Sequence, residues 1–526
     1  MAEAVAQRED KSGSGGMWLS LLAILSGTFV AILNNSLINV ALPAMVTIFG
    51  STTDTMQWVL TGYMLANAVM IPMSGSLSAK FGAKRVFVLS LTFFTISSVL
   101  CALAWSDTSL IAFRVIQGVS GGMIMPIGMS MIYMIVPREK IGMALGIFGI
   151  AAMTAPALGP TLGGYLVEFL SWQFLFLVGV PFGIFAIIMS SVLLKETPKK
   201  PELKFDYLGA FLAIVGFGAL LLAFSKGQAQ GWTSFYIVFL FFIAIMSLAL
   251  FVWVELGKEH PLLDLSLLKI PVFTISILTS GFVMMGMMGG IFLMPIFLQN
   301  VQGLTAMESG LLLMPQSIAM AIMMPISGKL LDKYGVGPIG LVGLSIMTVT
   351  TFELHNLAAD SMHEWIDRIL TIRGIGIGLC MMTLSTVGMN AVPRSRVGDA
   401  SPLSNVLRQV MSSFAIAILT VIMQSRQTFH MASIADNMNT DVATQLLSGL
   451  AGLYTQAGVD AASASGGAST LLYGIMAKEA LVQGIGDTFL VSTIPIALSL
   501  FLLYFLHKKP KASPSPEAPK GQNSAA

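Results

Sequence analysis

The sequence has little charge and almost no cysteine. Asp, Glu, Lys and Arg together make up 10% of its 526 residues, whereas 55% are hydrophobic. A soluble protein needs far more surface charge, so this composition excludes a soluble chain. The two cysteines, Cys101 and Cys380, lie within long apolar stretches, which excludes a disulfide framework and indicates a packing role.

The sequence also lacks the motifs of common enzyme and metal-binding classes. No phosphate-binding loop, nucleophile elbow or HExxH segment occurs in it. The five histidines show no metal-ligand spacing, and no basic patch is interleaved with aromatic residues. We therefore expect no enzymatic activity, no metal, no cofactor and no nucleic-acid partner.

Apolar runs near the ~20 residues that span a bilayer recur along the chain. They indicate an all-α integral membrane protein with fourteen spanning helices at about residues 17–42, 57–77, 85–105, 108–136, 141–165, 172–195, 207–225, 233–255, 271–298, 308–330, 338–355, 365–390, 402–424 and 488–507.

One eleven-residue segment occurs twice. Pro-Met-Ser-Gly-Ser-Leu-Ser-Ala-Lys-Phe-Gly fills 72–82, and Pro-Ile-Ser-Gly-Lys-Leu-Leu-Asp-Lys-Tyr-Gly fills 325–335. Each copy lies between two apolar runs, so the chain is expected to form two related six-helix bundles with two extra central helices. Substrate sites in such proteins lie between the halves, which rock to give alternating access. The repeat therefore indicates a transporter of a small-molecule substrate.

The helices and the repeat together predict a domain organisation. It consists of an N-terminal tail at 1–16, a six-helix bundle at 17–198, a two-helix insert with linkers at 199–262, a second six-helix bundle at 263–507 and a disordered tail at 508–526. The second bundle includes a long polar segment at 426–487. We expect this segment to be either a small external cap of short helices or a lid or partner-docking element.

The distribution of Lys and Arg predicts the orientation in the membrane. With both termini inside, only Lys226, Arg426 and Lys478 fall in outer loops, and the inner loops and tails hold many more. The opposite orientation would invert that ratio. We expect a multi-pass protein of a bacterial cell membrane with both termini cytoplasmic, in contact with lipid and present as a monomer.

Polar side chains within the predicted spans are candidates for a substrate and proton pathway, because they are costly in lipid and should face the bundle interior. The candidates are Asn34, Asn35, Asn39, Arg114, Gln117, Asp367 and Arg373. Counting 1.5 Å per residue along oppositely running helices puts Asn34 and Arg114 at comparable depth. We therefore expect the Arg114 guanidinium to bond the Asn34 or Asn35 amide, or Gln117. The alternative is that Arg114 snorkels to the interface.

Several stretches resemble motifs of the major facilitator superfamily. The resemblance to motif A rests on Gly75, Gly82, Lys84 and Arg85 in the first copy of the segment. In the second copy it rests on Gly328, Asp332 and Gly335. Motif B is resembled by Arg114 with Gln117, and motif C, which marks antiporters, by Pro156, Gly159, Pro160, Gly163 and Gly164. Residues 33–43 resemble the helix-1 motif of the fourteen-helix drug/proton antiporters of the EmrB/QacA type.

This resemblance implies export of drugs or other amphiphiles in exchange for protons. It also implies that motif A locks the two halves on the cytoplasmic side and that motif C governs helix packing between them. One rival interpretation is a dedicated exporter of a single metabolite or antibiotic. A second rival is a membrane sensor or scaffold that transports nothing, although such a protein would not need a rocking interface.

The chain lacks acidic residues at two positions where the family pattern usually has them. Asn34 stands where the helix-1 motif usually has an acid, and Ala79 stands at the acid position of the first motif A. The first bundle then has no deep carboxylate, and Glu353 and Asp367 are the remaining candidates for proton coupling.

We rank Asp367 first, because it adjoins Arg368 and precedes Arg373 on one helix, where burial near Arg would tune its pKa. The alternative is a solvated outer rim formed by Glu353, Asp367 and Arg368. Arg408 is expected either to join the two halves or to snorkel.

Methionines crowd 271–298 and 308–330. Flexible thioethers suit a pocket that repacks around different ligands, but they also fill ordinary helix contacts. The sequence leaves both interpretations open.

The predicted orientation can be tested by cysteine labelling of intact cells that express the chain. A membrane-impermeant thiol reagent should label single cysteines placed in 426–487 and should not label cysteines at Lys199 or Lys509. Labelling at either lysine position from outside would contradict the fourteen-helix map.

Overall fold

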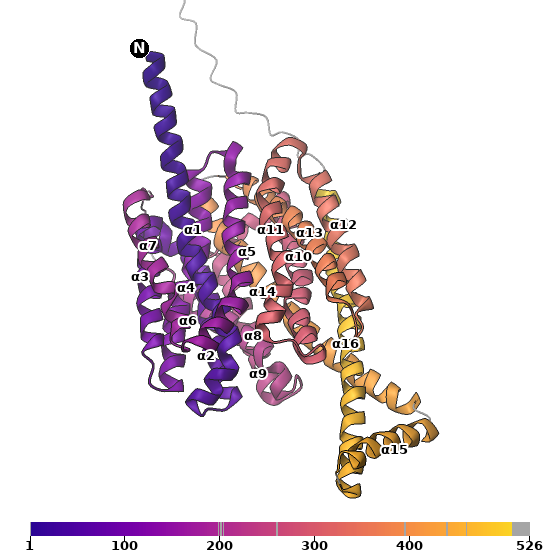
Figure 1. The fold of residues 1–526 in the computed structure, drawn as a ribbon. Coiled ribbons are helices and arrows are strands. Elements are labelled where there is room, and N and C mark those ends of the chain that lie inside the picture. The colour runs from indigo at the N-terminus through magenta and orange to yellow at the C-terminus, as the bar shows by residue number, and fades with distance from the viewer. Residues whose placement is uncertain are drawn as a thin grey trace, which may run out of the picture.

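A computed structural model describes residues 2–197, 199, 202, 205–258, 261–393, 396–437, 440–458 and 460–507. The described residues form helices joined by short turns, and they contain no strand. Figure 1 shows the first helices of the chain gathered in one bundle and the later helices in a second bundle beside it.

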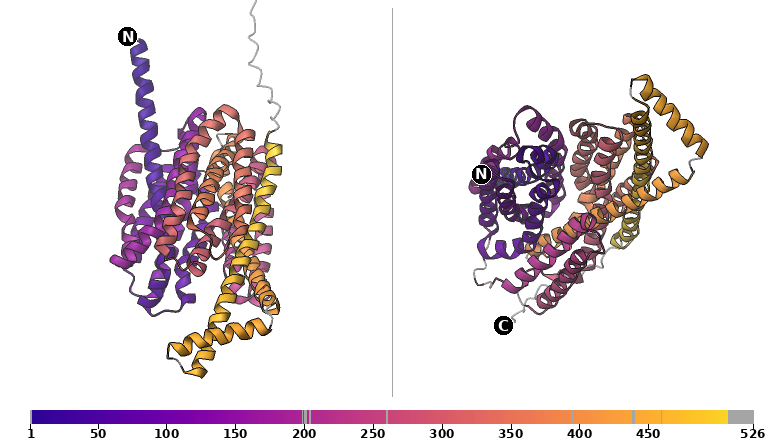
Figure 2. Two further views of the ribbon diagram at one scale, coloured as in Figure 1. Left: turned by 45° about the vertical axis from the view of Figure 1, so that its right-hand side comes forward. Right: turned by 90° about the horizontal axis from the view of Figure 1, so that it is seen from below.

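The N-terminal bundle is made of α1 (Ala2–Phe49), α2 (Thr53–Phe81), α3 (Ala83–Ala102), α4 (Asp107–Ile135), α5 (Arg138–Phe169), α6 (Phe174–Leu177) and α7 (Gly179–Leu193). Two further helices, α8 (Tyr207–Gln230) and α9 (Phe235–Leu256), follow it. Helix α8 packs against α2 of the first bundle and α14 of the second. The insert therefore lies alongside the junction of the two bundles, as the right-hand view of Figure 2 shows.

The C-terminal bundle is made of α10 (Pro271–Ile296), α11 (Ala306–Tyr334), α12 (Val336–Glu353), α13 (His363–Asn390), α14 (Val397–Asn437) and α16 (Ala461–His507). Three short elements and one amphipathic helix complete it, namely η1 (Leu265–Lys269), the π-turn η2 (Phe297–Val301), η3 (Leu354–Asn356) and α15 (Thr440–Gln456). Every predicted span therefore corresponds to a helix.

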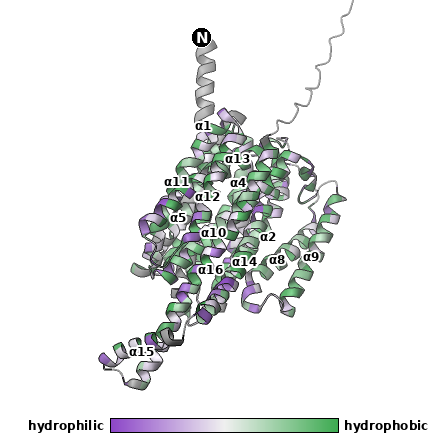
Figure 3. Ribbon diagram, turned by 90° about the vertical axis from the view of Figure 1, so that its right-hand side faces the viewer, coloured by the Kyte–Doolittle hydropathy of each residue, from purple (hydrophilic) through white to green (hydrophobic). Residues whose placement is uncertain are grey.

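The number of membrane spans stays a prediction. Among the described residues, twelve helical stretches are long and apolar enough to cross a membrane, and α2 and α5 are not among them. Both helices nevertheless pack inside the bundles, α2 against α4, and α5 against α1 and α11. Figure 3 shows that hydrophobic residues dominate the bundle helices and that hydrophilic residues are frequent near α15.

Several predicted boundaries were wrong. Helix α1 begins at Ala2 and continues through Pro43 to Phe49, so the 1–16 segment is helical from Ala2 and the helix does not end at 42. The predicted sixth span is confirmed as one apolar stretch, Phe174–Leu193, which comprises α6 and α7. The 426–487 segment consists largely of extensions of α14 and α16, which project beyond the bundle and carry α15 at their tip (Figure 1). The tail at 508–526 lies outside the described residues.

We call the end of the molecule where α1 begins and α16 finishes the tail end, and the end that carries α15 the hairpin end. The tail end is the one predicted to be cytoplasmic.

The repeated segment forms the same turn in both halves. A single glycine joins α2 to α3 and another joins α11 to α12, and both have positive φ, +95° at Gly82 and +77° at Gly335. Residues with a Cβ rarely adopt this conformation, which explains glycine at both places. The internal repeat of the sequence is therefore an internal repeat of the structure.

The packing next to each turn is repeated as well. A Cβ on Gly118 of α4 would lie 2.5 Å from the Tyr63 carbonyl oxygen of α2, and one on Gly374 of α13 would lie 2.3 Å from the Gln316 carbonyl oxygen of α11. Tyr63 and Gln316 both stand nine residues before the proline of their copy of the repeat. Glycine thus lets the same two backbones touch in each half.

The two halves meet mainly along α5 and α11. A Cβ on Gly146 of α5 would lie 2.5 Å from Pro325 Cα, and one on Gly149 would lie 2.1 Å from Met324 Sδ. The first copy of the repeated segment makes a similar contact between the halves. It joins α2 to α14, where a Cβ on Gly75 would lie 3.2 Å from the Gly398 carbonyl oxygen. Each copy of the repeated segment therefore touches the opposite half.

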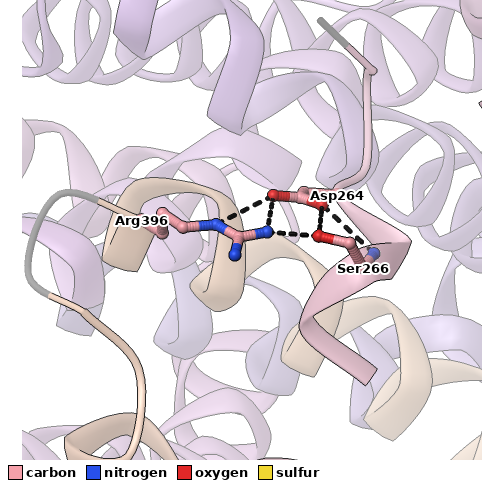
Figure 4. A network of polar contacts seen from close by, with 3 residues as sticks. All are labelled: Asp264, Ser266 and Arg396. Carbon is pink, nitrogen blue, oxygen red and sulfur yellow. Dashed lines mark hydrogen bonds and ion pairs between the residues drawn. The ribbon is translucent and has the colours of Figure 1, made fainter. Parts of the chain in front are cut away.

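Ion pairs and hydrogen bonds between polar side chains hold the loops at the tail end in place. Figure 4 shows Arg396, just before α14, paired with Asp264, which caps η1. Arg396 Nε donates to Asp264 Oδ2 at 3.1 Å, and Ser266 Oγ donates to Asp264 Oδ1 at 2.6 Å. Burial alone would raise the pKa of Asp264, but the bonds from Ser266 and Arg396 together hold that pKa below its ordinary value. Asp206, the cap of α8, forms a similar pair with Lys258.

The α5–α11 contact predicts the effect of adding one methyl group. Gly146→Ala forces a Cβ onto the backbone of Pro325, so the helices must separate, and overpacking of this kind costs about 1–3 kcal/mol. The thermal-unfolding midpoint of the purified protein should fall.

Gly164→Ala on the same helix is the matched control, because its Cβ would meet Met307 only at 3.8 Å. An equal midpoint in both variants would mean that the halves do not pack closely at Gly146.

Candidate functional site

The centre of the N-terminal bundle holds a buried arginine bonded to neutral oxygens. Arg114 on α4 is 0% exposed. Its Nη1 donates to Asn34 Oδ1 at 3.0 Å and to Gln117 Oε1 at 2.5 Å, and its Nε donates to the Val59 carbonyl oxygen at 3.1 Å. The contacts predicted from helix depth, to Asn34 and to Gln117, are thereby confirmed, and the snorkelling alternative is wrong.

Two aromatic rings lie against the same guanidinium. Its Cζ is 4.1 Å from the centroid of the Tyr63 ring and 5.9 Å from that of the Phe176 ring. Cation–π attraction stabilises a desolvated guanidinium by roughly 2 kcal/mol. The rings come from α2 and α6, so four helices together position the Arg114 side chain.

Arg373 on α13 is buried in the C-terminal bundle and is also 0% exposed. Its Nε donates to Thr351 Oγ1 at 3.1 Å, and its Nη2 donates to the Gly286 carbonyl oxygen at 2.8 Å. In the first half, Gln117 Nε2 donates to Ser98 Oγ at 2.6 Å. Ser98 and Thr351 each lie sixteen residues after the glycine that ends the repeated turn. Arg373 is thus the counterpart of Gln117 in the second half.

The predicted tuning of Asp367 by Arg373 was wrong. Asp367 lies one turn inside the start of α13, is half-buried, and bonds Thr371 Oγ1 at 3.5 Å. Within the described residues it forms no ion pair, and Arg373 bonds only neutral oxygens. Positions six residues apart on a helix do not lie on the same face, so the side chains of Asp367 and Arg373 point in different directions. Glu353 and Arg368 are both exposed, as the solvated-rim interpretation requires, whereas Asp367 is half-buried, so both interpretations stay open.

Two other candidate asparagines stand apart from this site. Asn35 is half-buried and forms none of the Arg114 bonds. The Asn39 side chain lies outside the described residues.

The motif A residues lie at the tail end. Gly75 packs on α14, and a Cβ on Gly82 would lie 2.3 Å from the Glu196 carboxylate. Lys84 is half-buried and Arg85 is exposed, and neither has an ion-pair partner among the described residues.

In the second copy Gly328 is buried and Gly335 is exposed. The Asp332 side chain lies outside the described residues, so its gating role stays a prediction.

Motif C packs mainly within the first half. A Cβ on Gly159 would lie 2.0 Å from Ser36 Oγ, and one on Gly163 would lie 2.9 Å from the Leu37 carbonyl oxygen, both on α1. Of the three glycines, Gly164 faces Met307 of α11 in the other half. The expectation that this motif governs packing between the halves stays a prediction, and Gly146 and Gly149 of the same helix make the closer contacts with α11. The side chains of Pro156 and Pro160 lie outside the described ones.

Sequence reasoning missed the polar seam between α4 and α14. Ser401 Oγ donates to the Pro126 carbonyl oxygen at 3.0 Å, and Arg408 Nη2 donates to Asn405 Oδ1 at 2.6 Å and reaches Met129 Sδ at 3.9 Å. Arg408 therefore joins the two halves, one of its two predicted roles. The spacing of Ser401, Asn405 and Arg408 at i, i+4 and i+7 marks one helix face and could have revealed the seam.

Methionines surround Arg408 on its other side. Together with Ser280, Val283 and Arg408, the residues Met284, Met287 and Met381 line a cavity of about 10 Å³. That volume holds at most about one water. In this conformation the methionines fill helix contacts.

Comparisons with known proteins agree with this architecture. The family described as Major Facilitator Superfamily matches residues 24–416. The uncharacterized MFS-type transporter YhcA of Bacillus subtilis is 36% identical over 505 residues, 95% of each chain. The probable multidrug resistance protein EmrY of Escherichia coli is 32% identical over 423 residues, which cover 79% of this chain and 82% of that protein.

A solved structure resembles the fold. The human organic anion transporter MFSD10 (TETRAN) matches with a TM-score of 0.59 over 91% of this chain and 99% of that one. At 13% sequence identity this likeness shows the fold alone.

The Arg373 contacts predict a difference between two adjacent threonines. Thr351→Val keeps the side-chain shape but leaves a charged, buried N–H without its acceptor, which costs about 1–3 kcal/mol. Thr350→Val is the matched control, because the Thr350 hydroxyl bonds only carbonyl oxygens of its own helix. The thermal-unfolding midpoint should fall clearly further for Thr351→Val. Equal midpoints would show that the bond contributes nothing.

Proposed function

The chain belongs to the major facilitator superfamily, and on this premise we propose that it exports drugs or other amphiphilic small molecules across the cell membrane. Transport proceeds by alternating access and is driven by the proton gradient. The observation that carries the proposal is the two-half architecture, in which each copy of the repeated segment contacts the opposite half. The multidrug resistance named for the EmrY relative supports a drug substrate.

The contacts between the halves are suited to a rocking motion. Among the described residues at the tail end they include glycine contacts and single hydrogen bonds, such as the one from Ser401 to the Pro126 carbonyl oxygen. None of the four ion pairs within the described residues joins one bundle to the other. Opening at this end breaks few strong interactions among these described contacts, as a transporter that cycles between two states requires.

The proposed substrate and proton pathway uses the buried polar residues Asn34, Arg114, Gln117 and Arg373. Asp367 is the proposed proton-binding carboxylate, because it is partly withdrawn from solvent, whereas Glu308 and Glu353 at the same end are exposed. We also propose that both termini of the chain are cytoplasmic.

Two other functions fit parts of the observations. A dedicated exporter of one metabolite or antibiotic would share the same architecture. A membrane sensor that transports nothing would not need paired contacts at both copies of the repeat. Resistance profiling of cells that express or lack the chain separates the three. A shift across unrelated amphiphiles supports the proposal, a shift for one compound supports the dedicated exporter, and no shift supports the sensor.

Arg114 provides the sharpest test of the site. Arg114→Lys keeps the charge but loses the planar fork that bonds Asn34, Gln117 and Val59 simultaneously. Export measured as dye efflux should be abolished, while the amount of protein in the membrane stays the same.

Arg368→Lys is the matched control, because this arginine is exposed on α13. Normal efflux by both Arg114→Lys and Arg114→Ala would show that Arg114 has no part in transport.

A further inference from the structure

We infer that Arg114 and Asn34 form a binding site for an anionic group, such as a carboxylate of the transported molecule or a free inorganic anion. This inference names the chemistry of the ligand and rests on the proposed function. It follows from the charges within the spans, from two unpartnered donors and from the different contacts of the two buried arginines.

The spans have an excess of buried positive charge. Of the acidic residues, only Glu255, Glu308, Glu353 and Asp367 fall inside the fourteen predicted spans, each within two residues of an end. Three arginines, Arg114, Arg373 and Arg408, lie at least six residues inside. No fixed carboxylate can therefore neutralise these arginines at their own depth.

The contacts of Arg114 leave two donors unused. Its Nε and Nη1 bond three neutral oxygens, but its Nη2 is buried and has no partner among the described residues. The same holds for Asn34 Nδ2, on the side chain whose Oδ1 accepts from Arg114. Buried donors in proteins are almost always satisfied. Two unsatisfied donors on one bonded pair, one of them charged, indicate a missing acceptor.

The missing acceptor is best supplied by an anion. A buried charge is strongly destabilising when nothing compensates it, and neutral oxygens and rings compensate only part of it. A planar guanidinium edge and an adjacent amide match the two oxygens of a carboxylate. A cationic group would be repelled by the guanidinium and would find no acceptor.

The second buried arginine has its unpartnered edge directly against a helix backbone. The unpartnered Nη1 of Arg373 points at the backbone of α10, where a Cβ on Gly290 would lie only 2.0 Å from it. That edge is closed by the helix itself. The anion site is therefore assigned to the N-terminal half alone.

The test compares two probes of nearly equal shape, benzoate and benzamide, on the full-length chain in lipid nanodiscs. The ionic strength is held constant with the sodium salt of a bulky sulfonate, and the thermal-unfolding midpoint is followed as each probe is titrated. Benzoate should stabilise the protein at a concentration at least tenfold lower than benzamide. Equal effects of the two probes would overturn the inference.

Asn34→Asp places a fixed carboxylate beside the guanidinium. This nearly isosteric change should weaken the benzoate effect at least tenfold, whereas Asn300→Asp, which adds the same charge at an exposed position, should leave it intact. An undiminished benzoate effect in Asn34→Asp would also overturn the inference.

Sodium chloride distinguishes the sources of the anion. Stabilisation by chloride that is lost in Asn34→Asp assigns the site to a free inorganic anion, and stabilisation by benzoate alone assigns it to a group on the transported molecule. Resistance profiling of the unmodified chain separates the two proposals. A benzoate preference without any resistance leaves the anion site standing and removes the exporter, and the reverse result removes only the anion site.

Discussion

Close contact between helix backbones at glycine is the constraint on which this structure depends. Lipid offers helices no hydrophobic gain on association, so packing and interhelical hydrogen bonds must hold them together. In the molecule, Gly118 and Gly374 bring α4 and α13 onto the carbonyl oxygens of α2 and α11, and Gly159 brings α5 onto α1. Gly146 does the same between the halves. A side chain at any of these four positions would collide with its neighbour.

The close packing also determines where polar groups can lie. Because α2 and α4 touch, Val59 and Tyr63 reach Arg114 from one side while Asn34 reaches it from α1. The guanidinium is sealed from solvent and held by neutral groups. A charge so placed is functional in most membrane proteins, since it would otherwise be replaced by an apolar residue.

The repeat gives the molecule two half-sites that are similar in construction and different in charge. The same α3 or α12 hydroxyl position accepts from Gln117 in one half and from Arg373 in the other. The two halves share their backbone geometry, but the buried arginine of the second half lies about one helical turn away from the position that matches Arg114. The two half-sites therefore present different donors to the space between the same pairs of helices.

The sequence alone determined the fold class, the helical runs and the internal repeat, and it named Asn34, Asn35 and Gln117 as the possible partners of Arg114. Apolar runs, a repeated segment and the rise per residue are local properties, so they can be read along the chain. The partners of Arg373, the separation of Asp367 from it, and the contact of Gly146 rather than Gly159 with the opposite half were decided only by the tertiary structure. The same is true of the contact between Arg408 and Met129. Each of these depends on the rotation of one helix against another, and that rotation results from packing over the whole bundle, which a pattern along one helix does not contain.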